Sequence, residues 1–390
     1  MFGNLKKLIR REICRFAKDK VMIALAIVIP VIICLIFVVI YDTGAITELP
    51  VAVYDADNSE VSRMFCRALD ASSSMKIVDN VNSIPEIEDG IRKGIYQGGF
   101  YFPANMERDI KANRQTHPVL YKNSQNIIVC NYLLREGLTI LRTYNAGVLL
   151  KKLRLKGASD EQGMAIVNPI SVDVSVLYNA NFSYLSFLSP GFIFVQFQMT
   201  IMLSALLVFV REFERKTIDS ALAIVNNNRA LFILGKALPL FLVHCCMAII
   251  ILCIAFPLGK IYLPGSYPAV ICITLLFVLA SFIPGLLLGA VVHDSFYVTE
   301  LSIFINMPTF IYSGYTFPLW AVPGLFVAFA QIMPFTHFFT AFFKVAQMNV
   351  SITYAFPEIC KLLAFIILPI PLLFLALGRK FPSQSGGAAC

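Results

Sequence analysis

Charged side chains of both signs are concentrated in residues 209–239, FVREFERKTIDSALAIVNNNRALFILGKALP, between two long apolar stretches. Five basic and three acidic side chains lie there. Closely spaced opposite charges give register and orientation against a partner surface more than they give affinity. A simpler alternative is a solvated hairpin whose charges pair with one another and set the topology of the chain. This stretch is the first candidate site, for docking.

Nucleotide-binding chemistry is not encoded in the same stretch. The Walker pattern G-x-x-x-x-G-K-[ST] binds phosphates through a glycine-rich loop, whereas RALFILGKA lacks the first glycine and ends in Ala237. No soluble segment that we place in the cytoplasm is long enough for a nucleotide-binding domain. The stretch therefore shows no sign of a nucleotide site of its own.

Few ionisable residues lie inside the apolar stretches, where a secondary transporter would carry its coupling groups. Glu300 and Asp294 lie near the ends of two such stretches, and His244 lies within a third. Glu300 is the best candidate for a polar pathway residue, although a hydrated boundary glutamate is the simpler alternative. Two of the apolar stretches also contain uncharged polar side chains, which are costly against lipid. They predict a pathway or a seam between two copies of the chain. These residues are Gln196, Gln198, Thr200, Ser204, Ser302, Asn306, Thr309 and Ser313.

The composition indicates that the chain is built for lipid. Of its 390 residues, 58% are hydrophobic and 14% charged, against about 45–50% and about 25% in a soluble domain. The net charge of +8 does not indicate nucleic-acid binding, because the basic residues gather at the ends of apolar segments.

Six apolar segments are long enough to cross about 30 Å of hydrocarbon as helices. They are residues 21–41, 187–210, 232–258, 267–292, 298–317 and 359–377. The first is longer than the apolar part of a signal peptide, so we expect a retained anchor. Basic residues in the loop 211–236 and after the last span predict that both termini are cytoplasmic.

The segments between the spans complete the predicted domain organisation. Residues 1–20 alternate basic and apolar side chains as an interfacial amphipathic helix does, and this helix would contact membrane lipid. Residues 42–185 alternate strand and helix patterns, which predicts an extracytoplasmic α/β domain with Ser59 as a helix N-cap. Within it, Asp55 and Asp57 predict a turn, and Cys66 and Cys130 could pair. Residues 186–380 hold the other spans, residues 318–354 are divided by prolines into a predicted outer re-entrant segment, and residues 381–390 form a cytoplasmic tail.

The charged stretch resembles the cytoplasmic loop of ABC-2 type transporter permeases, particularly the bacterial drug-export-type members with a large extracytoplasmic domain. In that family an R-E-x-E-R-x-T run precedes a polar turn and a G-K-x-x-P entry into the next helix. The matching positions here are Arg211, Glu212, Glu214, Arg215 and Thr217, then Gly235, Lys236 and Pro239. Lys216 stands where the family commonly has glycine. The resemblance covers the whole chain, including the amphipathic helix, the domain after span one and the broken segment.

The resemblance implies an α-helical integral membrane protein with six transmembrane helices and an α/β domain between helices 1 and 2. It implies a permease subunit of an exporter in the bacterial inner membrane, with no enzyme activity and no cofactor or metal of its own. ATP would be bound by a partner ABC ATPase that docks on Arg211, Glu212, Glu214, Arg215, Lys216 and Thr217. A second permease chain and a periplasmic adaptor protein are further implied partners. The alternatives left open are a secondary transporter and a membrane-anchored receptor, and no residue set selects a substrate.

Overall fold

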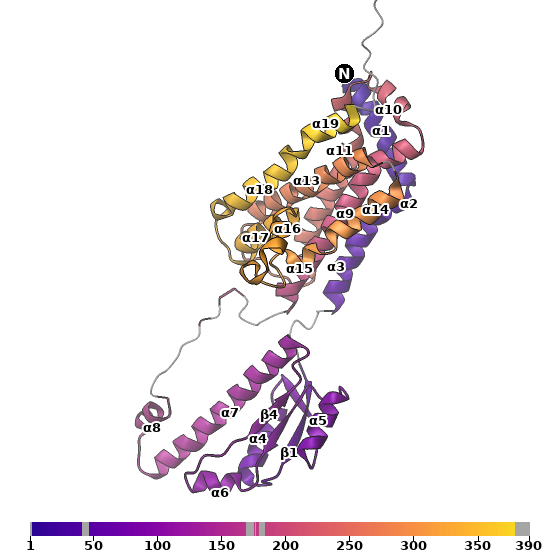
Figure 1. Cartoon of the computed structure of the whole chain (residues 1–390). Coiled ribbons are helices and arrows are strands. Elements are labelled where there is room, and N and C mark those ends of the chain that lie inside the picture. Colours follow the sequence, from indigo (N-terminus) through magenta and orange to yellow (C-terminus); the bar gives the residue numbers. More distant parts are fainter. Residues whose placement is uncertain are drawn as a thin grey trace, which may run out of the picture. The chain divides into compact units, whose positions relative to one another are not determined.

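The computed structural model describes residues 2–40, 47–168, 175, 177–178, 184–292 and 294–378. The chain forms two compact units (Figure 1), a helical unit of Met1–Gly44 with Val176–Cys390 and an α/β unit of Ala45–Ser175. The predicted tail 381–390 and the predicted boundary at residues 41–42 lie outside the described residues, whereas the predicted boundary at residues 185–186 is described.

The helical unit begins with the amphipathic helix α1 (Phe2–Lys18). Asp19 separates it from the next helix, because its carboxylate accepts hydrogen bonds from the backbone N–H groups of Val21 and Met22 as an N-cap does. The apolar helix that follows consists of α2 (Lys20–Ile23), a π-helical stretch η1 (Ala24–Val28) and α3 (Ile29–Ile40).

The remaining helices of this unit follow residue 183. They are α9 (Tyr184–Glu214), α10 (Ile218–Ile224), α11 (Arg229–Ile250) with η2 (Ile251–Ala255) and α12 (Phe256–Leu258), α13 (Tyr267–Val291), α14 (Ser295–Asn306), α15 (Thr309–Tyr312), η3 (Leu319–Ala321), α16 (Gly324–Gln331), α17 (Pro334–Phe342) with η4 (Phe343–Gln347), η5 (Ile352–Ala355), α18 (Phe356–Ile367) and α19 (Pro369–Gly378).

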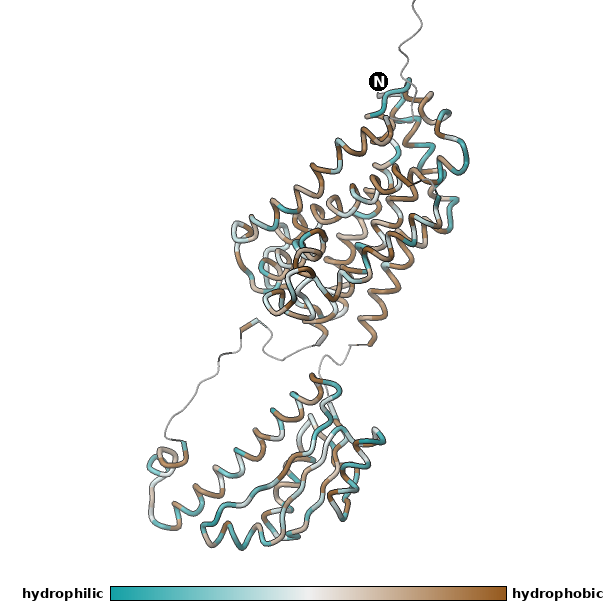
Figure 2. Tube along the Cα trace, in the orientation of Figure 1, coloured by the Kyte–Doolittle hydropathy of each residue, from teal (hydrophilic) through white to brown (hydrophobic). Residues whose placement is uncertain are grey.

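Five of the helices in the described residues are long and apolar enough to cross a membrane: Lys20–Ile40, Leu185–Glu214, Arg229–Leu258, Tyr267–Val291 and Ile352–Gly378. A bent pair, Gly324–Gln331 and Pro334–Gln347 at 83°, would make a sixth if it counts as one span. Figure 2 shows the brown, hydrophobic colour along these helices.

The predicted span 298–317 differs from the structure. α14 ends at Asn306, and a separate short helix α15 begins after Pro308. Proline has no N–H for the helix ladder and its ring clashes with the preceding turn, so the helix breaks there. Proline also divides the predicted re-entrant segment 318–354, which contains the bent pair.

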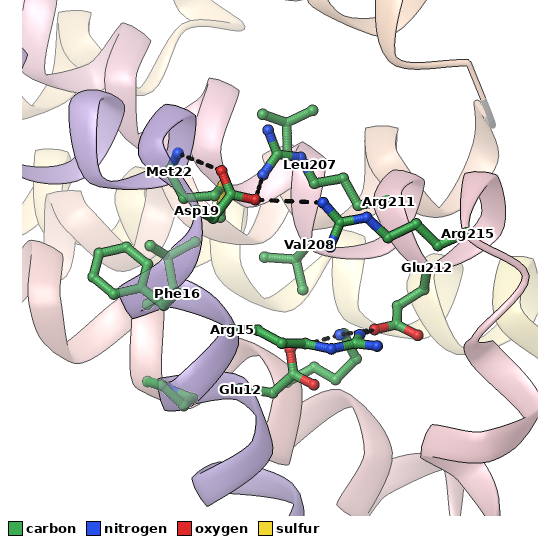
Figure 3. A pocket seen from close by; sticks show the side chains of 13 residues that line it. Glu12, Arg15, Phe16, Asp19, Met22, Leu207, Val208, Arg211, Glu212 and Arg215 are labelled. Atoms are coloured by element: carbon green, nitrogen blue, oxygen red, sulfur yellow. Dashed lines mark hydrogen bonds and ion pairs between the residues drawn. The ribbon is translucent and has the colours of Figure 1, made fainter.

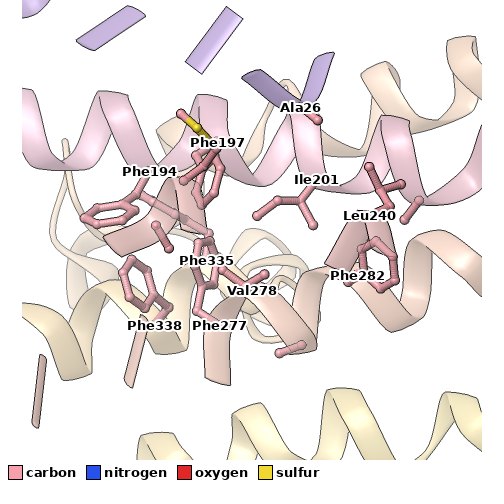
Figure 4. Packing of buried hydrophobic residues seen from close by; sticks show 14 of the residues in the cluster. Ala26, Phe194, Phe197, Ile201, Leu240, Phe277, Val278, Phe282, Phe335 and Phe338 are labelled. Atoms are coloured by element: carbon pink, nitrogen blue, oxygen red, sulfur yellow. The ribbon is translucent and has the colours of Figure 1, made fainter. Parts of the chain in front are cut away.

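The core of the helical unit is packed with phenylalanine rings from α9, α13 and α17 (Figure 4). Phe277 stacks on Phe338 with ring centroids 4.0 Å apart, and Phe194 meets Phe338 edge-on at 4.9 Å. Close backbone packing accompanies the rings, because Gly285 and Gly289 of α13 lie directly against α9. A Cβ at Gly289 would come within 2.0 Å of the Leu206 carbonyl oxygen, which is the small-xxx-small packing typical of membrane helices.

The α/β unit is built on a four-stranded sheet with the order β2-β1-β3-β4. Its elements are β1 (Leu49–Asp55), α4 (Glu60–Asp70), β2 (Met75–Asn80), α5 (Ile84–Arg92), β3 (Gly98–Phe102), α6 (Met106–Lys111), β4 (Val119–Lys122), α7 (Ile127–Leu155) and α8 (Asp160–Val167). β1 is parallel to β2 and β3, and β4 is antiparallel to β3. This is the alternation that the sequence predicts.

The two faces of this sheet have separate cores. Leu49, Val51, Phe100 and Phe102 pack against α4 and α7 on one face, and Ala52 packs with Ile87 of α5 on the other. The predicted N-cap is confirmed, because the Ser59 hydroxyl accepts the N–H of Ser62 in a reciprocal capping box.

Candidate functional site

The charged stretch forms the end of α9, the short helix α10 and the start of α11. α9 continues through Arg211 and Glu214. The turn to α10 is made at Lys216, whose φ of +52° is left-handed. Glycine adopts this conformation without the Cβ clash that other residues have, so the family's usual glycine fits this turn and Lys216 is strained there. Asn228 caps α11 by accepting the N–H of Leu231 at 3.0 Å.

Glu212 is the centre of a buried ion network that joins three helices (Figure 3). Its side chain is 2% exposed and lies 2.8 Å from the Lys236 Nζ of α11, which is also 2% exposed. Arg15 of α1, labelled in Figure 3, donates to the same carboxylate, and so does Arg11 of α1. Lys236 also donates to Glu12 of α1 at 2.7 Å. Each buried charge therefore has partners of opposite sign, as a charge in a dry environment requires.

A second ion pair fastens the start of α2 to α9. Asp19 accepts a hydrogen bond from Arg211 and lies 3.7 Å from Arg215 (Figure 3). Phe16 and Pro239 lie beside these charges and help to line a cavity of about 60 Å³. A cavity of this size has room for a few water molecules and no larger ligand. The charged side chains of this cluster therefore hold the helices together.

Gly235, the first residue of the G-K-x-x-P pattern, allows α1 to approach α11 closely. A Cβ at this position would lie 2.7 Å from Leu8 Cδ2 and 3.2 Å from Leu5 Cδ1. Leu8 is fully buried there. The next residue, Lys236, supplies the buried cation of the network. The two motif residues thus serve the same helix contact, one by its small size and one by its charge.

The predicted coupling residues separate into two groups. Glu212 is buried in the ion network, and Thr217 donates its hydroxyl to it at 2.6 Å. Arg211 is half-buried in the second ion pair, with Asp19. In contrast Glu214, Arg215 and Lys216 are exposed. The Glu214 carboxylate accepts the backbone N–H of Ser295 at 2.9 Å, which satisfies a donor at the start of α14.

The predicted pathway residues also divide. Gln198 and Asn306 meet in the interior, where the Gln198 amide donates to the Asn306 carbonyl at 2.8 Å, and Asn306 donates to the Ser302 carbonyl at 2.8 Å. Gln196 and Glu300 are exposed, and among the described residues neither takes part in such a contact. The polar side chains of Thr200 and Ser204 are bonded to carbonyls of their own helix.

Two features of this unit were not predicted from the sequence. Glu12 and Asp19 are the acidic partners of the network, and their signal is that they interrupt an otherwise basic segment. The second is a buried hydrogen bond of 2.6 Å between Ser204 of α9 and His244 of α11. It has no sequence signal, because the two residues are 40 positions apart.

The α/β unit shows no catalytic arrangement among its candidate residues. Asp55 accepts the N–H groups of Asp57 and Asn58 at 3.1 and 3.0 Å, and Asp57 accepts that of Glu107 at 3.0 Å. The prediction of a turn is therefore confirmed. Cys66 and Cys130 are free thiols. No group of His, Cys, Asp and Glu within the described ranges is arranged to hold a metal ion.

The long apolar helices define a multi-pass membrane protein. A family model described as "ABC-2 family transporter protein" matches residues 20–376. The chain belongs to this family, and the resemblance seen in its charged loop is confirmed.

Two relatives show the same relationship. YbhR of Escherichia coli (strain K12), a "Probable multidrug ABC transporter permease", is 27% identical over 348 residues, which cover 87% of this chain and 88% of YbhR. ABC transporter G family member 20 of Dictyostelium discoideum is 24% identical over 378 residues, or 95% of this chain. The match covers only 50% of the Dictyostelium protein. These relatives support a membrane permease as the role of the chain.

Proposed function

We propose that this chain is the permease subunit of an ABC-2 type exporter and is driven by a separate ABC ATPase that docks on the α9–α11 connection. The observation that carries the proposal is the family match over residues 20–376, together with an exposed, charged helical connection at one end of the long helices. The ATP would be bound by that partner subunit, so the permease needs no cofactor of its own.

The position of the connection supports docking at one end of the helical unit. α10 contacts α1, and Arg229 at the start of α11 donates to the carbonyl of Gly378 at the end of α19 at 3.5 Å. The first and last helices therefore reach the same end as the charged connection, where Figure 1 places the N label, α10 and α19. We propose that this end is cytoplasmic, in the bacterial inner membrane, and that the α/β unit is extracytoplasmic.

The charges have different roles in this proposal. Glu212, Lys236 and Arg211 hold the connection against α1, and the exposed Glu214, Arg215 and Lys216 face the ATPase. Asp219 in the first turn of α10 is exposed as well and extends the two-signed surface. α10 connects α9 to α11, and the network joins both of these helices to α1. A displacement of α10 would therefore be transmitted to all three helices.

The test reverses one exposed charge. Lys216 makes no ion pair or side-chain hydrogen bond with any described residue, so Lys216→Glu should leave the fold intact. We expect several-fold less ATPase to copurify with the variant, and a similar loss of transport-stimulated ATP hydrolysis, because charges at the edge of an interface mainly alter association.

Lys260 provides a matched control. It is an exposed lysine with a φ of +57°, in the connection between α12 and α13, which joins the opposite ends of the helices. Lys260→Glu should copurify the ATPase normally. Equal behaviour of the two variants would remove the docking assignment, and a chain that copurifies no ATPase would favour a secondary transporter or a receptor.

We further propose that two permease chains form the pathway. The support is an exposed stripe that begins on α14 and continues past the break at Pro308 onto α15. Tyr297, Glu300 and Phe304 recur on α14 at spacings of three and four residues, which place them on one helical face. Met307 and Ile311, which follow α14, are exposed as well. A carboxylate such as Glu300 is costly against lipid, so a second chain is the better neighbour. The periplasmic adaptor remains a prediction.

A further inference from the structure

The α/β unit contains a cavity of about 550 Å³. It lies between α7, α6 and the connection from α6 to β4, all within this unit. The volume falls within the range of about 300–1,000 Å³ that is typical of small-molecule sites. The cavity has no part in the ion network or the proposed docking surface.

The inner wall of the cavity is apolar. Phe65 of α4 and Met106 of α6 are 5% and 1% exposed and belong to the core of the unit. Leu141, Val148 and Leu149 line it from α7. The first part of α7 is covered by the sheet, where Leu133 is fully buried, whereas Leu149 further along is 38% exposed. Apolar surface of α7 is therefore left open towards the cavity.

The rim of the cavity is cationic. Arg114, Arg142 and Lys152 line it, and none of its lining residues is acidic. Lys152 already has hydrogen-bond partners, since its ammonium donates to the Ile110 carbonyl and to Asn113 Oδ1. Arg114 and Arg142 differ from it, because their guanidinium groups make no ion pair or side-chain hydrogen bond with any described residue.

Two unpaired guanidinium groups beside open apolar surface fit one class of ligand. A guanidinium presents a planar fork of donors that matches carboxylate, sulfonate or phosphate oxygens. The neighbouring apolar wall is stabilised when a hydrophobic group covers it. We propose that the cavity binds an anionic amphiphile, with its charged group at Arg114 and Arg142 and its apolar part against Phe65, Met106 and Val148.

This proposal is independent of the docking surface on α10. An amphiphile bound here would contact only the α/β unit, so ligand binding would survive the loss of ATPase coupling. The shared chemistry allows two sources, a lipid headgroup with short chains and a free single-chain amphiphile.

The experiment uses the full chain in nanodiscs of zwitterionic lipid, with 8-anilinonaphthalene-1-sulfonate as the probe. Its sulfonate is charged throughout the working pH range, and its fluorescence rises in an apolar site. We expect a saturable signal above that of empty nanodiscs. The double variant Arg114→Gln/Arg142→Gln should raise the Kd of the probe about tenfold, because the charge-assisted hydrogen bonds are lost.

A matched control removes two positive charges that do not line the cavity. Arg67 of α4 and Arg108 of α6 are exposed, and Arg67→Gln/Arg108→Gln should leave the Kd unchanged. A second variant, Val148→Trp, fills the apolar part and should reduce the number of probe molecules bound. Thermal unfolding of each variant verifies that the α/β unit is folded.

Competitors distinguish the two sources. Displacement of the probe by dodecanoate supports a single-chain ligand, and displacement by dihexanoylphosphatidylglycerol supports a lipid headgroup. No saturable signal above empty nanodiscs, or the same Kd in folded Arg114→Gln/Arg142→Gln and wild-type protein, would overturn the proposal.

Discussion

At the residue scale, the charges of the α9–α11 connection show that one motif serves two purposes. Glu212 and Glu214 are two positions apart, yet one is buried among cations of α1 and α11 and the other is exposed. The sequence predicts a charged, two-signed site but cannot separate these roles. The partners of Glu212 on α1 lie 197 and 201 positions away in the chain, beyond the reach of any local pattern.

Replacing Glu212 tests its structural role. In Glu212→Gln the buried Lys236 keeps only Glu12 as an acidic partner, and removing one member of a buried pair costs about 3–5 kcal/mol. We expect a clearly lower unfolding temperature in detergent and less protein in the membrane. Asp219→Asn, an exposed acid on α10, should change the stability by at most about 0.5 kcal/mol.

A double variant sharpens this test. Glu212→Gln/Lys236→Met removes both buried charges, so Lys236 is no longer a buried cation that has lost an acidic partner. The double variant should therefore recover part of the stability that Glu212→Gln loses. An unfolding temperature in Glu212→Gln equal to that of the wild type would show that the network contributes nothing to the fold.

At the element scale, the length of the apolar segments predicts five of the six spans well, and a proline interrupts the remaining one. The predicted spans 187–210 and 267–292 lie within or almost within α9 and α13. Both helices contain a proline, Pro190 and Pro284, and continue through it. Pro308 interrupts the fifth span instead. Hydropathy cannot tell these cases apart, because neighbouring helices decide whether the freed backbone groups find new partners.

The contact between α9 and α13 depends on a glycine that hydropathy does not reveal. A Cβ at Gly289 would lie 2.0 Å from the Leu206 carbonyl oxygen, so Gly289→Ala must push the helices apart. We expect a loss of about 1–3 kcal/mol, as for other overpacked cores, measured as a lower unfolding temperature. Gly324→Ala is the control, since nothing lies within 4 Å of its added Cβ. Similar stability of the two variants would contradict the close packing.

At the scale of the whole molecule, the structure divides the residues that the sequence places at a pathway or a seam between two copies. The sequence places Gln198 and Asn306 at this seam because lipid would leave their polar groups unsatisfied. In the structure each is bonded within its own chain. We propose the exposed stripe that includes Glu300 as the face for a second chain. That Gln198 and Asn306 are covered could be seen only in the fold, since burial by α9 is not visible in a single helix pattern.

Cysteine crosslinking tests this face. Single cysteines at Phe304, Met307 and Ile311 should form disulfides between two chains under oxidation, whereas cysteines at Leu363, Leu372 and Leu375 should not. The control positions are apolar residues of α18 and α19 that are exposed, as the stripe positions are. Covalent dimers are read from non-reducing gels of a chain whose native cysteines are replaced. Equal crosslinking at both sets would contradict a seam at α14.

The ion pairs that Glu12 and Asp19 form with later helices have a consequence during synthesis of the chain. Asp19 precedes its partner Arg211 by 192 residues, and Glu12 precedes Lys236 by 224. At about 5–20 residues per second, a ribosome needs about 10–40 s to synthesise the chain between Asp19 and Arg211. During that interval Asp19 lacks Arg211, and Glu12 has its neighbour Arg11 but not Lys236. The amphipathic helix α1 can therefore reach its final position only after α9 and α11 have been synthesised.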